Sequence, residues 1–280
     1  MKKRGKKVIY DVHEDFPINI RAKDYLPKIV RSAIAKVFEI YEKRKASRFD
    51  AVITVTPQIV ERFQRYGAPT ALVTNFPIVE DDLPKHERQD GIKILCFAGA
   101  VSPSRMHHVV VKAIQSMEGV CYQIAGKDTS QGAKYTDELK VLDSNSRLQL
   151  LGRLDRTDVL QLYERSTIGI ALVDPDYSPL SFDGKGSIGA TKLFEYMEAG
   201  LPLICQNYYY WKEIVESNHC GIAVDSRNVD EVARAIRYLL DHEEEALEMG
   251  RNGQKAILEK YNWESQEKAL LDIYRRVEET

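Results

Sequence analysis

The chain has 280 residues, of which 44% are hydrophobic and 29% are charged, and its formal net charge is −2. This composition is typical of a globular protein and excludes wholesale disorder and collagen-like repetition, while the near-neutral charge argues against a general nucleic-acid binder. No apolar run reaches the roughly 18 residues that a membrane-spanning helix requires.

The chain begins with a basic stretch, MKKRGKK, that leads directly into a short strand-like run. It contains no apolar stretch of signal-peptide length, so we expect a cytoplasmic protein. The cysteines lie far apart, mostly within apolar runs, and form neither a C-x-x-C pair nor a cluster with histidine: Cys96, Cys121, Cys205 and Cys220. We therefore expect buried, reduced thiols and no metal site.

Short β-branched runs alternate with longer amphipathic stretches along the whole chain, which is typical of β-α units on a parallel sheet. Strands are predicted at residues 7–12, 51–55, 71–74, 92–98, 120–125, 148–151, 167–173, 201–205 and 221–224. Helices are predicted at about 26–46, 57–66, 105–117, 132–143, 155–165, 190–199, 208–217, 228–240, 243–260 and 263–278.

The polar segment Glu80–Asp90, which contains a proline and has no apolar period, is the best candidate for a linker. Six predicted strands follow it, enough for a complete doubly wound sheet, but only three precede it, and these are a thin basis for an independent core. Because an unpaired hydrophobic edge strand favours association, we expect self-association through residues 1–80 or a second polypeptide that supplies the missing strands.

The predicted helix at 26–46 has a basic and an apolar side. Its basic residues are Lys28, Arg31, Lys36, Lys43, Arg44 and Lys45, and its apolar stripe is formed by Ile29, Val30, Ile34, Val37 and Ile40. Two interpretations remain open at this point: a solvated helix packed on the sheet, and a basic face that rests on anionic lipid as a peripheral membrane contact.

A glycine-rich loop between a strand and a helix is the most informative segment. The strand ends at Val173, the loop follows, and the helix runs from about 190 to Gly200. A helix N-terminus presents free N–H groups and the positive end of a dipole, and glycines let a phosphate approach closely. Residues 186–190 could therefore form an anion cradle.

The same loop spells G-x-G-x-x-G with Gly184, Gly186 and Gly189, but this is a weak dinucleotide fingerprint. The motif should directly follow a strand and be followed by an acid about 20 residues on, and here a long loop intervenes. Glu195, about one and a half turns into the helix, could accept hydrogen bonds from a ribose diol. The alternative is a surface glutamate paired with Lys192.

A second strand-to-helix loop, FAGAVSPSRMHH, carries Gly99, which permits close backbone approach, and Arg105, which could clamp a diphosphate. The alternative is an ordinary surface arginine at a helix start. His107 and His108 are predicted to lie on the helix surface. His13, just past a strand end, lies at the sheet edge where such folds bind ligands, or is a hydrogen-bonded structural histidine.

The segment TKLFEYMEAGLPLICQN resembles the signature of retaining GT-B glycosyltransferases, in particular the family-four group that builds bacterial surface polysaccharides. The resemblance extends over nearly the whole chain: FAGAVSPSRMHHVVVKAI is similar to the glycine loop of that family, and VIYDVHEDFP, DAVITVTPQIVERF and LVTNFPI are similar to the last part of its N-terminal domain. It implies a GT-B-like fold with a partial Rossmann-like N-terminal domain at 1–85, a complete Rossmann-like donor domain at 86–262, and a C-terminal helix at 263–280 that packs back on the N-terminal domain.

The resemblance also assigns roles in binding a nucleotide diphosphate-sugar. Glu195 would hold the donor ribose, Arg105 the diphosphate, and Gly99 would let that diphosphate approach the backbone. Gly152 and Leu154 would lie beside the nucleobase. The phosphate-facing helix start would comprise Ser187, Gly189, Ala190 and Thr191, and His13 would reach the donor sugar, so that the expected catalytic residues are His13 and Arg105.

The chain departs from the family pattern in three places. The first glutamate of the paired-glutamate motif is replaced by Ser187, and the second base of the first loop is replaced by Ala100. The first half of the N-terminal domain, which would bind the acceptor, has no counterpart in the sequence.

The function implied is sugar transfer with retention from a nucleotide diphosphate-sugar to a glycan or lipid-linked acceptor, without a metal or other cofactor. One alternative is an incomplete, non-catalytic donor-binding subunit that needs a partner chain. A further alternative is a nucleotide-sugar epimerase of the same fold.

Overall fold

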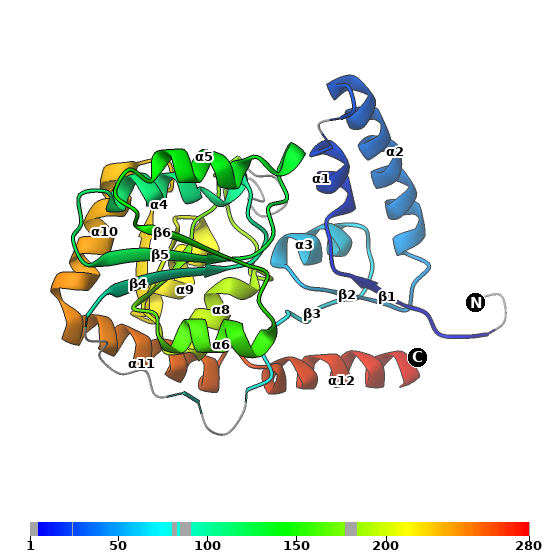
Figure 1. The fold of residues 1–280 in the computed structure, drawn as a ribbon. Coiled ribbons are helices and arrows are strands. Elements are labelled where there is room, and N and C mark those ends of the chain that lie inside the picture. Colours follow the sequence, from blue (N-terminus) through cyan, green and yellow to red (C-terminus); the bar gives the residue numbers. More distant parts are fainter. Residues whose placement is uncertain (1–4, 24, 80–82, 85–90, 177–183, 280) are drawn as a thin grey trace.

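The computed structural model describes residues 5–23, 25–79, 83–84, 91–176 and 184–279, so most of the predicted linker at Glu80–Asp90 lies outside the described residues. The described chain forms two lobes, each built on its own parallel sheet (Figure 1). We call residues 5–79 the N-terminal lobe and residues 91–262 the C-terminal lobe. Every predicted strand is present, and its ends differ from the prediction by no more than two residues.

The N-terminal lobe has a three-stranded sheet in the order β1-β2-β3. Its strands are β1 (Ile9–Val12), β2 (Ala51–Thr54) and β3 (Thr70–Leu72). The register pairs Val52 with Tyr10 on one side and with Thr70 on the other. Successive side chains of β2 point to opposite faces of the sheet, so both faces need a cover.

Helices cover both faces of this small sheet. On one face lie α1 (Phe16–Arg21), α2 (Lys28–Ala46) and α3 (Pro57–Arg65), and on the other lies α12 (Trp263–Glu279). Val52 packs with Ile59 and Phe63 of α3, whereas Ile53 packs with Ile273 of α12. The last helix of the chain therefore contributes to the core of the N-terminal lobe (Figure 1).

The C-terminal lobe has a six-stranded parallel sheet in the order β6-β5-β4-β7-β8-β9. Its strands are β4 (Lys93–Ala98), β5 (Val120–Ala125), β6 (Leu148–Gly152), β7 (Ile168–Ala171), β8 (Leu203–Gln206) and β9 (Gly221–Val224). The strand order reverses between β4 and β7. In doubly wound sheets such a reversal opens a crevice at the carboxyl ends of the strands.

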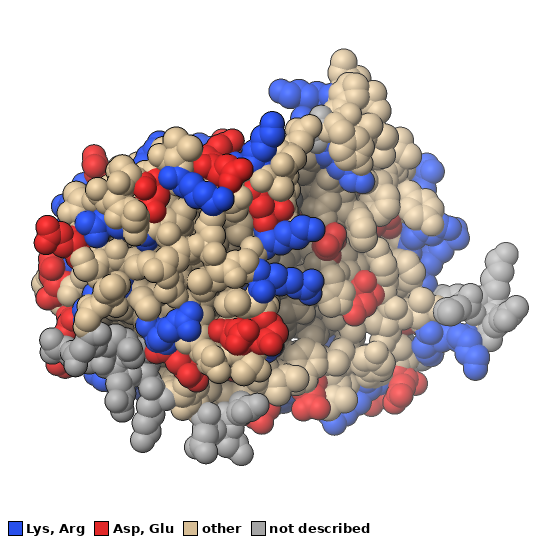
Figure 2. All heavy atoms as spheres, viewed as in Figure 1, with Lys and Arg blue, Asp and Glu red and all other residues tan. Residues whose placement is uncertain are grey.

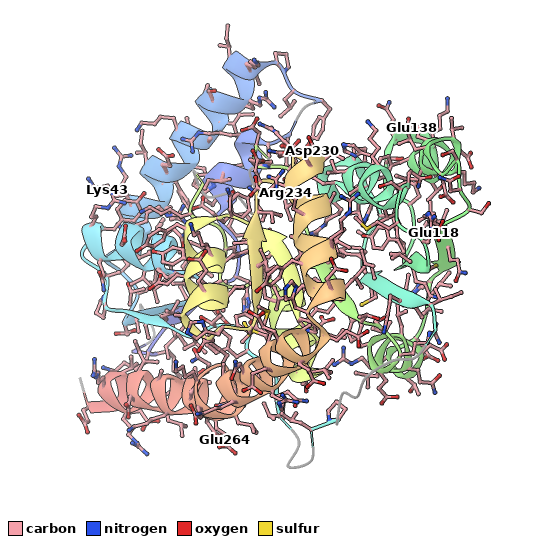
Figure 3. All side chains as sticks on the ribbon, turned by 90° about the vertical axis from the view of Figure 1, so that its left-hand side faces the viewer. Lys43, Glu118, Glu138, Asp230, Arg234 and Glu264 are labelled. Carbon is pink, nitrogen blue, oxygen red and sulfur yellow. The ribbon has the colours of Figure 1, made fainter. Side chains whose placement is uncertain are left out.

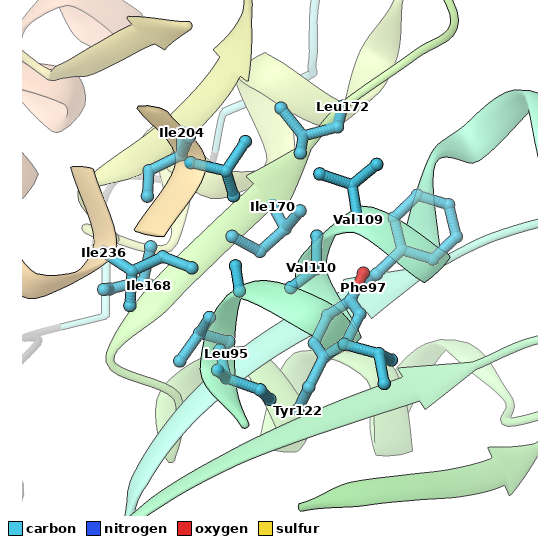
Figure 4. Close-up of a cluster of buried hydrophobic side chains, with 14 of the residues drawn as sticks. Leu95, Phe97, Val109, Val110, Tyr122, Ile168, Ile170, Leu172, Ile204 and Ile236 are labelled. Carbon is cyan, nitrogen blue, oxygen red and sulfur yellow. The ribbon is translucent and has the colours of Figure 1, made fainter. Parts of the chain in front are cut away.

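Two separate apolar clusters fill the space between this sheet and its helices. One face is covered by α4 (His107–Ile114), α5 (Tyr135–Leu142) and α10 (Val229–Asp241). The other is covered by α6 (Arg156–Glu164), α8 (Thr191–Glu198), α9 (Tyr209–Ser217) and part of α11 (Glu243–Glu259). Figure 3 shows α10, with Asp230 and Arg234 labelled, beside α4. Figure 4 shows the first cluster, in which Leu95 and Ile170 meet Val110 and Ile236.

Two local features differ from the prediction. The short helix α1 was not predicted; Asp15 caps it by accepting a 3.0 Å hydrogen bond from the Ile18 N–H. The helix predicted at 105–117 begins later, because Pro103–Arg105 forms a 3₁₀ turn and Met106 takes a left-handed conformation (φ 54°). The helix α4 therefore starts at His107.

The four cysteines are buried and unbridged, as predicted. Among the described residues, no helix combines the length and the apolarity that a membrane crossing requires.

Candidate functional site

The candidate site lies at the reversal of strand order, where the loops after β4 and β7 face each other. The two loops are joined by a hydrogen bond of 2.8 Å from the Asp174 N–H to the Ser104 carbonyl oxygen. The molecule is hollowed between the two lobes, and Lys and Arg side chains lie along the edge of that hollow (Figure 2). The predicted Gly99–Arg105 loop is thus in contact with the beginning of the loop after β7.

The first loop is held by a row of glycine contacts. A β-carbon at Gly126 would lie only 1.7 Å from the Gly99 carbonyl oxygen, so a larger residue there would displace the loop. The Gly126 N–H in turn donates to the Gly152 carbonyl oxygen at 2.7 Å. The backbone of Gly126 therefore contacts both Gly99 and Gly152, which are predicted site residues. Leu154, two residues further on, is half-buried against the second apolar cluster.

Arg105 closes the 3₁₀ turn at the end of this loop and is half-buried. The pKa of the neighbouring His107 is lowered to about 3, mainly by burial and next by the positive charge of Arg105. The turn thus places a cation near a buried histidine that is neutral at neutral pH.

The prediction that His107 lies on the helix surface is wrong. Its side chain is fully buried, and Nδ1 lies 2.8 Å from the Tyr122 hydroxyl. The reason is its place on the helix: His107 shares a face of α4 with Val110, Val111 and Ile114, all fully buried. That i, i+3, i+4, i+7 spacing was the available signal. His108 is half-buried, with Nδ1 2.9 Å from the Tyr135 hydroxyl.

The second loop approaches α8 over a dense aromatic support. A β-carbon at Gly186, which has φ +78°, would lie 2.6 Å from Tyr208 Cβ. Trp211 Nε1 donates to the Ser187 carbonyl oxygen at 2.8 Å. From the other lobe, Gln58 Nε2 donates to the Gly186 carbonyl oxygen at 3.1 Å. The approach to the helix is therefore fixed by both lobes.

The start of α8 presents its N–H groups without a side-chain cap. The residue before the helix is Ala190, which makes no capping hydrogen bond. The Ser187 hydroxyl is buried and accepts from the Gly189 N–H at 3.2 Å, two residues short of Thr191 and the helix. Uncapped N–H groups at a helix start are suited to an anion.

Glu195 lies on the inner side of α8 and is engaged by three side chains. Its Oε2 accepts hydrogen bonds of 2.7 Å from the Tyr163 hydroxyl and 2.7 Å from Lys192 Nζ, and Arg156 Nη1 lies 4.0 Å away. Burial acts to raise the pKa of Glu195, but Lys192, Tyr163 and Arg156 outweigh it and the pKa is lowered. The carboxylate is charged at neutral pH, and since all three contacts reach Oε2, Oε1 can accept from a ligand hydroxyl.

A cavity of about 240 Å³ lies beside this carboxylate. It is bounded by the chain crossing between the lobes and by α6 and α8, and its lining residues are Asn75, Phe76, Pro77, Arg156, Thr191, Phe194, Glu195 and Glu198. Two predicted site residues, Thr191 and Glu195, therefore face the same cavity.

His13 lies apart from these residues. It follows β1 in the N-terminal lobe, its side chain is 58% exposed, and Nε2 lies 3.1 Å from Asp11 Oδ2. The neighbouring Asp15 has structural contacts: it caps α1 and forms a 2.6 Å ion pair with Arg62 of α3. The role of His13 toward a sugar stays a prediction.

Sequence reasoning did not assign a role to Tyr163, Lys192 or Gln58. Lys192 was considered only as a partner of Glu195, and Tyr163 sits in a helix with no motif of its own. Within the described residues, no group of three His, Cys, Asp or Glu side chains is arranged to hold a metal ion.

Comparison with known proteins identifies relatives of this chain. The family model described as "Glycosyl transferases group 1" matches residues 79–256. Over 81 residues, the chain is 35% identical to a GDP-mannose-dependent alpha-(1-6)-phosphatidylinositol monomannoside mannosyltransferase of Mycobacterium tuberculosis, a match that covers 29% of this chain and 21% of the relative. Over 194 residues, it is 26% identical to D-inositol 3-phosphate glycosyltransferase of Mycobacterium marinum, covering 66% of this chain and 38% of the relative. The chain thus spans well under half the length of these relatives.

Solved structures show the same fold. The structure of Alr3699/HepE of Anabaena in complex with UDP and glucose matches with a TM-score of 0.71 and 15% identity, over 98% of this chain and 73% of that chain. Sucrose-phosphate synthase of Thermosynechococcus elongatus matches with a TM-score of 0.70 and 19% identity, over 99% of this chain and 70% of that chain. The predicted α/β, GT-B-like fold with parallel sheets is confirmed.

Proposed function

The chain belongs to the glycosyl transferases group 1 family, and from this premise we propose that it transfers a sugar, with retention, from a nucleotide diphosphate-sugar to a hydroxyl of a glycan or lipid-linked acceptor. One observation supports the proposal most directly. The helix α8 has both an uncapped N-terminus, suited to a phosphate, and a charged carboxylate, Glu195, of which Oε2 accepts hydrogen bonds from the protein.

The donor would lie along this crevice with each part matched to a chemical group. Oε1 of Glu195 would accept from a ribose hydroxyl, and the nucleobase would lie toward Gly152 and Leu154. The diphosphate would rest between the Gly99–Arg105 loop and the helix start formed by Ser187, Gly189, Ala190 and Thr191. This order is supported by the row of contacts that links Gly152, Gly126 and Gly99.

In the transfer step, the acceptor oxygen forms a bond to the anomeric carbon while the bond from that carbon to the diphosphate oxygen breaks. The hydroxyl proton passes to the departing diphosphate. Negative charge develops on the diphosphate, so cations and oriented N–H groups there stabilise the transition state. Arg105 and the α8 N–H groups would supply this stabilisation, His13 would reach the donor sugar, and we propose no metal ion or other cofactor.

A second candidate function is donor binding without turnover until a partner is present. The strand β1 lies at an edge of its sheet, and α2 exposes a line of apolar side chains at helical spacing, which we call the α2 stripe: Val30 (43% exposed), Ile34 (45%), Val37 (67%) and Tyr41 (57%). Such an edge and stripe are suited to another polypeptide, either a second copy or a different chain. The basic residues of α2 also allow contact with anionic lipid, which would place the protein at the inner face of a membrane.

The proposed function is tested by a thermal-shift screen of the purified chain against UDP-, GDP-, ADP-, CMP- and dTDP-sugars. A ligand present at 100 times its dissociation constant stabilises the fold by about 2.7 kcal/mol. A shift with one family of donors and not with the others supports donor binding and names the base. No shift with any of them contradicts it.

A further inference from the structure

We propose that Lys192 is a second cation of the diphosphate site. It takes the place of the basic residue that the first loop lacks at Ala100. The inference rests on the proposed function, since it concerns how the same site holds its donor. Arg105 is the one cation that the sequence pattern assigned to that site, and Lys192 comes from the opposite wall of the crevice.

The Lys192 side chain lies close to the first loop. Lys192 is the second residue of α8, and its chain reaches across the crevice toward the first loop: a β-carbon at Gly99 would lie 3.5 Å from Lys192 Cε. The terminal amine is therefore close to the residue next to Ala100. Its side chain is 23% exposed, so it is largely held by the protein but still open to a ligand.

The hydrogen-bonding capacity of the amine carries the second step. An ammonium group has three N–H donors, and one of them goes to Glu195 Oε2 at 2.7 Å. The same oxygen also accepts from the Tyr163 hydroxyl at 2.7 Å, so Glu195 keeps a donor when Lys192 turns toward a phosphate. The remaining N–H groups of Lys192 can therefore serve an anion without leaving Glu195 unpaired.

A cation is needed between the Glu195 carboxylate and the diphosphate. The ribose carboxylate, Glu195, is charged, and in a nucleotide the ribose and the diphosphate are covalent neighbours. Without a cation between them the carboxylate would repel the phosphates in a partly buried setting, where such repulsion is weakly screened. Lys192 lies against both the Glu195 carboxylate and the Gly99 loop. It can therefore neutralise the carboxylate and bind a diphosphate placed against that loop.

The test measures how much the diphosphate contributes to binding, as the ratio of the nucleoside Kd to the nucleoside diphosphate Kd. UDP, GDP and ADP are titrated by calorimetry, and uridine, guanosine and adenosine by ligand-observed NMR. The proteins are the wild type, K192M, K192R, the double variant K192M/A100R, and K140M, which removes an exposed lysine of α5 paired with Asp137. K192Q replaces K192M if the latter does not fold.

We expect K192M to lower this ratio at least tenfold, K192R to keep it within threefold, and K140M to leave it unchanged. In the double variant, the arginine at position 100 should recover at least a third of the lost ratio. An equal weakening of nucleoside and diphosphate by K192M would show that Lys192 only holds Glu195, and would overturn the proposal while leaving donor binding intact. Failure of A100R to recover the ratio would also overturn it. A wild-type protein that binds none of the diphosphates contradicts the proposed function itself.

Discussion

The Tyr163 hydroxyl donates a 2.7 Å hydrogen bond to Glu195 Oε2, joining α6 to α8 from beneath the candidate ribose site. Burial, and next the Glu195 charge, raise the pKa of Tyr163 well above its ordinary value, so the phenol keeps its proton and acts as a donor at neutral pH. Together with Lys192, this contact occupies Oε2 of the carboxylate.

Replacement Tyr163→Phe keeps the ring in place and removes only this hydroxyl. We expect nucleoside diphosphate binding to weaken about three- to tenfold, or about 0.7–1.4 kcal/mol, because Glu195 loses its orientation but keeps Lys192. Calorimetry measures the loss. The matched control is Tyr238→Phe, which removes a 2.7 Å hydrogen bond from an exposed tyrosine to Glu245 and should not change binding. An identical effect of both variants would argue against an orienting role.

Replacement Arg105→Ala should weaken diphosphate binding much more than nucleoside binding, by about 1.5–3 kcal/mol, the scale of a hydrogen bond to a charged group. The reason is that the guanidinium is assigned to the phosphates and not to the base or ribose. Titrations with a nucleoside and its diphosphate make the comparison, and Arg251→Ala, an exposed arginine of α11 paired with Glu248, is the control. Equal losses for both ligands would contradict the assignment.

Replacement Glu195→Gln preserves shape and removes charge. We expect donor binding to weaken by about 1.5–3 kcal/mol, and a 2′,3′-dideoxynucleoside diphosphate to show no such loss, because it lacks the hydroxyls that the carboxylate would read. Glu216→Gln on α9, where the glutamate pairs with Lys212 at the surface, is the control. If Glu195→Gln binds the intact donor as well as the wild type does, Glu195 is structural.

The buried His107 predicts a loss of stability in acid. Its pKa is about 3 in the folded state, below the ordinary 6.5, so only the unfolded chain takes up a proton as the pH falls from 6.5 toward 3. The stability that the neutral imidazole contributes is complete above pH 6.5 and decreases below it. Between pH 7 and pH 5 this amounts to about 2 kcal/mol. Urea unfolding at both values measures it.

Variants isolate this contribution from that of the carboxylates. His107→Gln should be less stable than the wild type at pH 7 and should lose about 2 kcal/mol less between pH 7 and pH 5. His242→Gln, which changes an exposed histidine after α10, should follow the wild type. The same slope in all three proteins would show that His107 does not remain neutral.

The α2 stripe and the β1 edge predict that the purified chain is not a self-sufficient monomeric transferase. Light scattering should show association, and Val37→Glu should reduce it, whereas Val141→Glu, at an 84% exposed site on α5, should not. A transfer assay on the chain alone should give slow donor hydrolysis or no turnover until a partner is added. A clean monomer that transfers sugar at about one per second or faster would refute this prediction.

The strands and most helices were predictable because each depends on local pattern. The run ILCFA, for example, is apolar throughout, which is enough to define β4 whatever its neighbours are. The start of α4 was not, since it depends on a left-handed conformation at Met106, which single-sequence patterns rarely indicate. The burial of His107, by contrast, was indicated by its helical spacing to Val110, Val111 and Ile114.

The candidate site could be predicted only in part. Gly99, Arg105 and Glu195 stand in recognisable sequence settings, and their roles toward a donor stay predictions. The position of Lys192 beside Gly99 was not predictable from spacing, because it depends on how α8 packs against the loop after β4, more than ninety residues away in the chain. The same holds for Gln58, whose contact with Gly186 spans 128 residues.

The two places where the chain passes between the lobes are tied to each other: the Trp263 N–H donates to the Pro77 carbonyl oxygen at 2.8 Å. A rigid rotation of one lobe about this pair leaves both crossings intact, which is how a hinge works. The bond from Gln58 to Gly186 joins one lobe to the loop that precedes α8, and a rotation that moves these two residues apart would stretch it. A change in the angle between the lobes would then act on the helix start where the phosphates are proposed to bind.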